Sequence, residues 1–225
     1  MKSLVSILKE LPSTKVIDAN IDYSEYLSLD LSPNNLELIN KNLQTSTDFE
    51  NYITDYLRTN NAKAAYGGYI ETRTLYQRSE IFRNDLIPER NIHIGIDLWT
   101  KAQTPVLAAL DGIVHSFKNN NNLGDYGPTI ILEHEIENQK IYTLYGHLSL
   151  QSIEKINVGD FFKQGECLAT LGDSKINGDY APHLHFQIIK NIGDYLGDYP
   201  GVCNKNDLDF YTENCPDPNL LLKII

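Results

Sequence analysis

Cysteine is scarce in this chain, with three residues among 225, and an odd number cannot pair completely within one polypeptide. Cys203 and Cys215 have eleven residues between them, which is not the spacing of a zinc finger. The cysteines therefore define neither a disulfide framework nor a structural metal site. A reducing compartment is the simpler interpretation, and a disulfide between Cys203 and Cys215 remains an open alternative.

Long apolar runs and an excess of basic residues are also missing. No run approaches the about 18 apolar residues of a membrane helix, and the apolar stretch within residues 1–10 is too short for an export signal. Nineteen basic against thirty acidic residues give a net charge of -11, which opposes binding to nucleic acid or to an anionic membrane. We therefore expect a cytoplasmic protein with neither partner. The oligomeric state is not indicated.

The pattern of the chain changes near residue 65. Upstream, Ser32 and Pro33 have the form of a helix start, and Thr47 to Glu50 has the form of a capping box for a second helix. An apolar stripe follows at helical spacing and is expected to pack on its own domain rather than to form a docking surface: Phe49, Tyr52, Ile53, Tyr56 and Leu57. The prediction is an N-terminal helical accessory segment over 1–65.

Downstream of this boundary, short β-rich runs are separated by clusters of glycine, asparagine and aspartate. Residues 129–132 and 141–145 are examples, and both are rich in β-branched and aromatic side chains. This texture predicts a mainly β domain over 66–225 with antiparallel sheet.

Metal-ligating residue types recur in three strand-like stretches of this second part. His93 and Asp97 lie in the first, His147 in the second, and His183 and His185 in the third. A catalytic zinc ion takes imidazole and carboxylate ligands from three residues and keeps a further position for water. His93, Asp97 and His185 supply that number, and two histidines remain. The pattern predicts a zinc site with one ion per chain.

The spacing of these residues makes a further prediction about the backbone. A straight strand rising about 3.3 Å per residue would hold residues 93 and 97 about 13 Å apart, too far for one ion. The strand must therefore bend, and Gly95 lies at the midpoint, where a kink meets least steric resistance. His183 and His185 need no bend because alternate residues of a strand share one face.

Other landmarks accompany these residues in the same order. They are Tyr145-Gly146-His147-Leu148-Ser149, Thr104-Pro105-Val106, Ala109 to Val114, Gly124 to Gly127, Val158-Gly159-Asp160 and Gly165-Glu166. Together with the histidines they resemble the lysostaphin-type zinc metallopeptidases, family 23 of the metallopeptidases, from about Tyr66 to Phe186. Asn91 and Gln103 depart from the family pattern, which puts substrate contacts and one turn in doubt rather than the metal.

The resemblance implies a duplicated hybrid motif fold, an antiparallel β-sandwich or open barrel. It implies that His93, Asp97 and His185 bind zinc, that His147 and His183 are catalytic, and that the substrate is a peptide bond in peptidoglycan crosslinks or muropeptides. Because histidine titrates near pH 6.5, both catalytic histidines suit proton transfer, and spacing does not tell which is the base. Tyr145 is expected to pack, and His115 and His134 to be structural or exposed.

Two other functions remain open. A relative that keeps the peptidase fold without cleaving would act as a scaffold or activator, although intact ligands count against this. A biotinyl or lipoyl carrier domain shares the glycine-rich turns but needs an exposed lysine, commonly between methionines, and the single methionine here is Met1. A cell-wall substrate is also in tension with a cytoplasmic location, and a role in the cell envelope would require export by another route.

Overall fold

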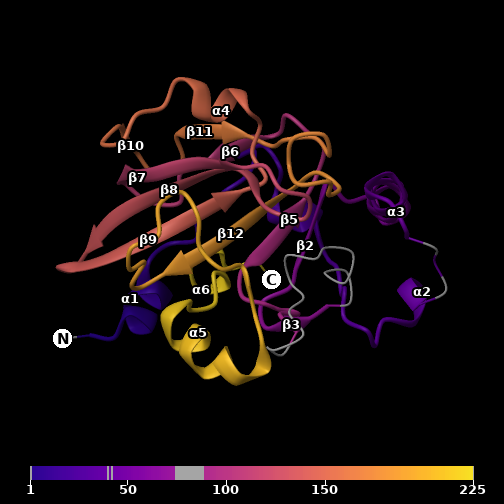
Figure 1. Ribbon diagram of the computed structural model, residues 1–225, viewed down its shortest axis with the longest axis horizontal. Helices are drawn as coiled ribbons and strands as arrows, with labels where there is room; N and C mark the ends of the chain where they lie inside the picture. The colour runs from indigo at the N-terminus through magenta and orange to yellow at the C-terminus, as the bar shows by residue number, and fades with distance from the viewer. Residues whose placement is uncertain (1, 40, 42, 74–88, 225) are drawn as a thin grey trace.

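An eight-stranded sheet forms the centre of the computed structural model, which describes residues 2–39, 41, 43–73 and 89–224 (Figure 1). Within these ranges the strand order is β1-β2-β5-β12-β9-β8-β7-β10, and all neighbours are antiparallel except the parallel pair β1–β2. The strands are β1 (Tyr26–Ser28), β2 (Ala64–Gly67), β5 (Ile96–Trp99), β7 (Gly112–Asn120), β8 (Gly127–Ile136), β9 (Gln139–Gly146), β10 (Phe161–Phe162) and β12 (His183–Ile189). The predicted mainly β fold with a small N-terminal helical segment is confirmed.

Two smaller sheets and short helices complete the described fold. One sheet pairs β6 (Pro105–Leu107) with β11 (Cys167–Thr170), and the other has the order β13 (Val202–Cys203), β4 (Ile92–His93) and β3 (Glu71–Thr72). The helices are α1 (Leu4–Glu10), α2 (Leu36–Ile39), α3 (Ser46–Thr59), α4 (Gln151–Glu154), α5 (Leu208–Asn214) and α6 (Asn219–Leu222). Throughout the described ranges, each helix is too short or too polar to cross a bilayer.

The strands β8 and β9 form a hairpin where the sequence predicts two strands. Both turn residues, Glu137 and Asn138, have positive φ angles of 48° and 60°. This is the backbone of a tight two-residue turn whose twist matches that of the flanking strands. The second strand of the hairpin, β9, ends at Gly146, and His147 is the next residue.

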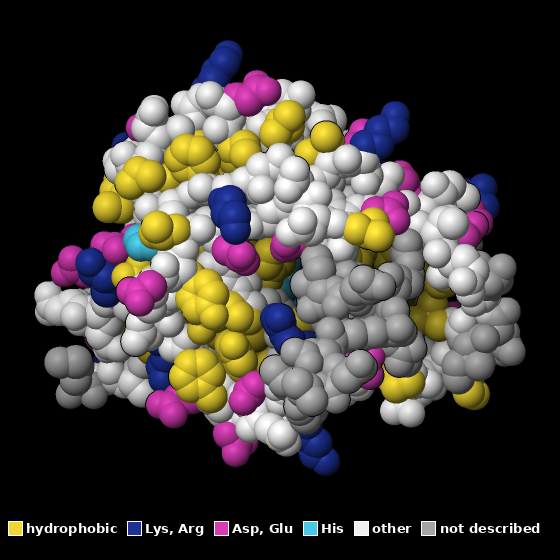
Figure 2. Space-filling model, in the orientation of Figure 1, with side chains coloured by type: hydrophobic (Ala, Val, Ile, Leu, Met, Phe, Trp, Pro, Cys, Tyr) yellow, Lys and Arg dark blue, Asp and Glu magenta, His cyan; other side chains and the backbone are white. Residues whose placement is uncertain are grey.

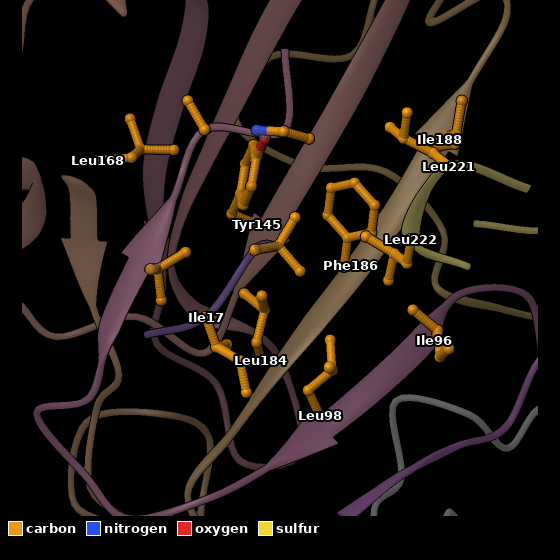
Figure 3. Close-up of a cluster of buried hydrophobic side chains, with 14 of the residues drawn as sticks. Ile17, Ile96, Leu98, Tyr145, Leu168, Leu184, Phe186, Ile188, Leu221 and Leu222 are labelled. Atoms are coloured by element: carbon orange, nitrogen blue, oxygen red, sulfur yellow. Dashed lines mark hydrogen bonds between the residues drawn. The ribbon is translucent and has the colours of Figure 1, made fainter. Parts of the chain in front are cut away.

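The main core lies on the face of the sheet that carries the even-numbered residues of β12. Leu184, Phe186 and Ile188 are fully buried there, together with Leu98 of β5 and Tyr145 of β9 (Figure 3). Because side chains alternate along a strand, His183 and His185 lie on the opposite face of β12. Burial of each large apolar side chain stabilises the fold by about 1.5–3 kcal/mol. The core thereby fixes the strand that carries two of the predicted site residues.

Helix α3 confirms the predicted apolar stripe but begins differently from the prediction. Thr45 is the N-cap: its side chain accepts from Asp48 N, and the Asp48 carboxylate accepts from Thr45 N. The capping box thus lies two residues before the predicted Thr47–Glu50, because the Asp48 side chain faces back to Thr45. Phe49, Tyr52 and Ile53 are buried in one cluster with Ala65 and Trp99, so the stripe packs on its own chain.

The earlier predicted helix is shorter than expected. Residues 33–34 form a turn, and α2 spans only Leu36–Ile39 within the described residues. Ser32 Oγ accepts from Asn34 N, and this local bond stabilises the turn in place of a first helical turn. In Figure 1, α2 and α3 lie at one end of the molecule, on the side of β2 and β5. The domain boundary at residue 65 stays a prediction, while β1 of the N-terminal segment extends the central sheet.

Charged side chains of both signs are interspersed over the face of the molecule seen in Figure 2. Lysine and arginine side chains occur there singly rather than in one basic patch. Hydrophobic side chains gather around α5, where Phe210 is exposed.

Candidate metal centre and active site

The three predicted metal ligands lie together, two of them on the paired strands β5 and β12 and the third on β4. His185 of β12 stands directly opposite Asp97 of β5 in the strand register, and His93 ends β4. The Nδ1 atom of His185 lies 2.8 Å from His93 Nε2 and 3.1 Å from Asp97 Oδ1. His93 Nε2 is 3.3 Å from the same carboxylate oxygen. One ligand atom from each residue is therefore available to a single ion, all within 4.8 Å of one another.

The predicted bend between His93 and Asp97 is confirmed. The strand breaks between β4 and β5, with a bend at Gly95. A Cβ atom on Gly95 would lie 2.6 Å from His185 Cε1 and 2.9 Å from the Phe186 carbonyl oxygen. Glycine is thus required here because His185 packs directly against the backbone of the bend.

Hydrogen bonds fix which nitrogen of each candidate ligand histidine faces the centre of the cluster. His93 Nδ1 lies 2.8 Å from the Gly68 carbonyl oxygen, and His185 Nε2 lies 2.9 Å from Gln187 Oε1. Both partners are acceptors, so these nitrogens carry the ring protons. The lone pairs of His93 Nε2 and His185 Nδ1 then face each other and a carboxylate oxygen. A cation satisfies this arrangement, and the nitrogen and oxygen donors suit zinc.

Burial and charge favour deprotonated ligands. Burial is the main reason that the pKa of His93 falls to about 4, and the nearby Arg73 guanidinium lowers it further. Burial disfavours the charged form of Asp97, but His93, Arg73 and His183 together hold the pKa of its carboxyl well below the usual range. At neutral pH the site therefore offers a neutral imidazole and a carboxylate, which are the forms that bind a metal.

The two predicted catalytic histidines lie side by side next to this centre. His147 and His183 have ring centroids 4.1 Å apart, and His183 Nε2 is 4.0 Å from Asp97 Oδ1. His147 Nδ1 donates to the Asn177 carbonyl and His183 Nδ1 to the Ala181 carbonyl, each at 2.8 Å. These bonds leave Nε2 of both rings as a base. Burial is the main cause that lowers the pKa of each histidine.

The backbone at His147 is unusual for a residue with a side chain. His147 has a φ of 63°, in the left-handed region, immediately after β9 ends at Gly146. Its N–H donates to the Tyr126 carbonyl and its own carbonyl accepts from Gly172 N, both at 2.9 Å. The surrounding loops thus hold a conformation that costs about 1–3 kcal/mol at a position where it directs the imidazole toward the site.

A pocket of about 270 Å³ opens onto both groups of residues. Aromatic side chains line much of it, including Trp99, Tyr126, Tyr180 and Tyr199. Phe49 of α3 also lines the pocket, so the N-terminal segment forms part of the wall. Histidine, arginine and aspartate side chains share the lining with these aromatic rings, so the cavity offers both apolar and polar contacts.

The other predictions for single residues agree with the structure. Tyr145 is fully buried, and its hydroxyl accepts from Ala109 N at 2.8 Å, so it packs in the core. His134 is buried and bonded to the Asp111 carbonyl and the Thr143 hydroxyl. His115 is half-buried against Tyr142. None of these three contacts the candidate site.

Three further side chains contact the predicted ligands without having been predicted to do so. Arg73 Nη1 donates to Asp97 Oδ2 at 2.5 Å, and Tyr126 Oη lies 3.4 Å from His185 Nε2. Gln187 is the acceptor for His185. Position 187 continues the 183, 185 alternation of β12, so the strand pattern contains the information needed to find it. No spacing connects Arg73 with the ligands.

Comparison with known proteins agrees with this site. Residues 91–196 match the model described as Peptidase family M23, and this range contains all five predicted site residues. The chain is 31% identical over 100 residues to the peptidoglycan DD-endopeptidase ShyC of Vibrio cholerae serotype O1. That match covers 44% of this chain and 20% of ShyC, so the chain spans about a fifth of the length of this relative.

Solved structures include two similar domains. The catalytic domain of the antimicrobial peptidase lysostaphin from Staphylococcus simulans is 24% identical, covers 68% of this chain and 94% of its own, and has a TM-score of 0.38. The catalytic domain of the prophage-encoded M23 protein EnpA from Enterococcus faecalis is 20% identical, covers 56% of this chain and 85% of its own, and also has a TM-score of 0.38.

The sequence match defines the class of the domain that carries the site. Residues 91–196, just under half of the chain, match Peptidase family M23, the family of lysostaphin-type peptidases that the motifs resemble. The predicted family is confirmed.

Proposed function

We propose that this chain is a zinc-dependent endopeptidase that hydrolyses peptide bonds in peptidoglycan crosslinks or in soluble muropeptides. The observation that carries the proposal is the convergence of His93 Nε2, Asp97 Oδ1 and His185 Nδ1 within 4.8 Å. The match of residues 91–196 to Peptidase family M23 and the similarity to a peptidoglycan DD-endopeptidase support the reaction and the substrate class.

The donor set fits one zinc ion per chain. His93, Asp97 and His185 would hold it and leave a position for solvent, as in other catalytic zinc sites. When bound, zinc supplies a Lewis acid that polarises a carbonyl group and lowers the pKa of a water molecule toward about 7. The three ligands are almost fully buried, so the charge of the ion would act in a poorly hydrated environment.

His147 and His183 would carry the protons of the reaction. Because their Nδ1–H groups are engaged by backbone carbonyls, each ring presents a neutral Nε2 toward the pocket at neutral pH. A neutral imidazole accepts a proton from the attacking water and, once charged, returns a proton to the leaving amine. The charged ring also stabilises the oxyanion of the tetrahedral intermediate. We assign these roles to the two histidines jointly.

Metal content tests the ligand set. We expect about one zinc per purified chain, as set by the three-ligand site, and we expect His185→Ala to lose most of it. His115→Ala is the matched control because His115 lies outside the site, and it should retain the metal. Stoichiometric zinc in His185→Ala would contradict the proposed ligands.

Hydrolysis tests the catalytic assignment. His147→Ala should keep its zinc, because His147 is not among the proposed ligands, yet lose cleavage of crosslinked peptides. The variant and the wild-type protein should be incubated with purified peptidoglycan and with soluble muropeptides in parallel, and the products identified by mass spectrometry. Unchanged turnover by His147→Ala would remove this residue from the mechanism.

The same digestion tests the expected location. Preference for soluble muropeptides over intact peptidoglycan would support the proposed cytoplasmic role. Efficient release of peptides from intact peptidoglycan would instead support a role in the cell envelope.

A further inference from the structure

A buried arginine contacts the metal centre directly. Arg73 lines the pocket with its side chain 1% exposed, and its Nη1 atom donates to Asp97 Oδ2 at 2.5 Å. The guanidinium also lies over the Trp99 ring, with Cζ 5.5 Å from the ring centroid. An arginine beside a proposed metal ligand is unexpected, because its charge repels a divalent cation. Its position therefore requires an explanation.

The surrounding residues hold this guanidinium firmly in place. Arg73 Nε donates to Glu71 Oε2 at 2.6 Å, and Glu71 Oε1 accepts from Leu31 N at 2.9 Å. Gly68 leaves the room it needs, since a Cβ atom there would overlap Arg73 Nη2. The Leu31 amide belongs to the N-terminal segment, so a continuous chain of contacts runs from that segment through Glu71 and Arg73 to Asp97.

The two oxygens of Asp97 have different partners. Oδ2 accepts from Arg73, whereas Oδ1 faces His93 Nε2 at 3.3 Å and His185 Nδ1 at 3.1 Å. An arginine fork has fixed directions, unlike a lysine ammonium, so it defines the rotation of the carboxylate that it binds. One oxygen is thereby directed to the centre and the other is kept from it.

We infer that Arg73 is a positioning residue that commits Asp97 to binding the metal through one oxygen, and that Glu71 and the Leu31 amide anchor it from the N-terminal segment. The inference rests on the proposed function, because it takes Asp97 as a zinc ligand. It adds to that function a role for residues outside the matched range 91–196.

The sign of the change in zinc affinity separates positioning from charge alone. If Arg73 acted only through its charge, Arg73→Met would bind zinc more tightly and Arg73→Lys would bind it as the wild type does. If Arg73 positions Asp97, both variants weaken binding, because neither can donate to Glu71 and Asp97 in a fixed fork. Loss of a group that orients a metal ligand typically lowers affinity by about 10–100-fold.

The experiment measures zinc affinity by competition with a chelator for the wild-type chain, Arg73→Lys and Arg73→Met. Arg58→Met is the matched control, since Arg58 forms an exposed ion pair with Asp55 on α3. We expect a loss of about 10–100-fold for Arg73→Met, a smaller loss for Arg73→Lys and no change for the control. Cobalt-substituted Arg73→Met should also show weaker visible absorption, because both Asp97 oxygens can then bind and raise the coordination number.

Tighter zinc binding by Arg73→Met, or wild-type affinity in Arg73→Lys, would overturn the inference. If Arg73→Met does not fold, Glu71→Gln is the milder test, because it keeps Arg73 but removes its ion-pair anchor. Unchanged zinc affinity in Glu71→Gln would also count against the proposed contacts from Leu31 through Glu71 and Arg73 to Asp97. Failure of the function itself looks different: the wild-type protein would then bind no zinc.

Discussion

The His185 imidazole and the Gln187 amide form a pair on one face of β12. His185 Nε2 lies 2.9 Å from Gln187 Oε1, and the amide nitrogen of Gln187 is held by the Pro200 carbonyl and by Cys215 Sγ, each at 3.2 Å. These two contacts fix the amide so that its oxygen faces the imidazole. The pair thereby leaves Nδ1 of His185 without a proton and directed to His93 Nε2 and Asp97 Oδ1.

Replacing Gln187 with methionine should weaken zinc binding without removing a ligand. The variant keeps a side chain of similar length but loses the acceptor for His185 Nε2–H, so the ring can rotate or change its tautomer. We expect affinity for zinc to fall by about 10–100-fold, as is typical when the partner of a ligand histidine is lost. Chelator competition measures it. Gln164→Met is the control, because Gln164 is exposed. Equal affinities in the wild type and Gln187→Met would contradict this role.

The closeness of the proposed ligands could be predicted because their chemistry and their periodicity agree. His183 and His185 alternate with Leu184 and Phe186, and this period of two defines both the core face and the site face of β12. The length of a straight strand likewise required a bend near Gly95, where the structure has one. The regular geometry of a strand was sufficient to predict both the face that carries His183 and His185 and the bend at Gly95.

The contacts that orient the site could not be predicted in the same way. Carbonyls of Gly68, Asn177 and Ala181 accept from three of the histidines, and any residue type can supply a carbonyl. Arg73 reaches Asp97 through the tertiary fold, across 24 positions of sequence. The start of α3 was misplaced for a related reason, because two overlapping segments could each form a capping box, and the Thr45–Asp48 pair forms it.

Alanine at position 95 should impair both metal binding and stability. The added Cβ would lie 2.6 Å from His185 Cε1 and 2.9 Å from the Phe186 carbonyl, so His185 must move. We expect Gly95→Ala to lose most of its zinc and to unfold at a lower temperature. Metal analysis and thermal unfolding measure the two effects.

The control for this change is Gly193→Ala. A Cβ atom added to Gly193 would meet open space, but the φ of 58° means that alanine there should cost about 1–2 kcal/mol of stability through backbone strain. It should leave the zinc content unchanged. Full zinc occupancy in Gly95→Ala would show that the bend tolerates a side chain and would contradict the packing argument.

Stability of the zinc-free protein should fall with decreasing pH, and His134 provides a test outside the metal centre. Burial lowers the pKa of His134 below its usual 6.5, so the unfolded chain takes up a proton more readily than the folded one. The stabilisation from neutral His134 is complete above pH 6.5, the pKa of histidine in the unfolded chain. It is lost as the pH falls through the lower pKa that His134 has in the folded protein. One such group contributes up to about 1.4 kcal/mol per pH unit within that window.

Urea unfolding of zinc-free protein between about pH 8 and about pH 5 measures this dependence. His134→Gln removes the titrating group, so the slope of the unfolding free energy against pH should decrease by up to about 1.4 kcal/mol per pH unit. The slope is compared rather than the absolute stability, because the variant also loses a contact with Asp111 or Thr143. Parallel pH curves for the two proteins would contradict the lowered pKa.

Trp99 should report metal binding directly, because it is the single tryptophan of the chain and stacks on His183 with centroids 5.9 Å apart. Its ring is buried and lines the same pocket as the three proposed ligands. Cobalt, which absorbs visible light and quenches nearby indoles, should therefore reduce the fluorescence of the zinc-free protein in a saturable way. Zinc, with its filled d shell, should restore the emission as it displaces cobalt. His185→Ala should show no saturable quenching, and quenching equal to that of the wild type would mean that cobalt binds elsewhere.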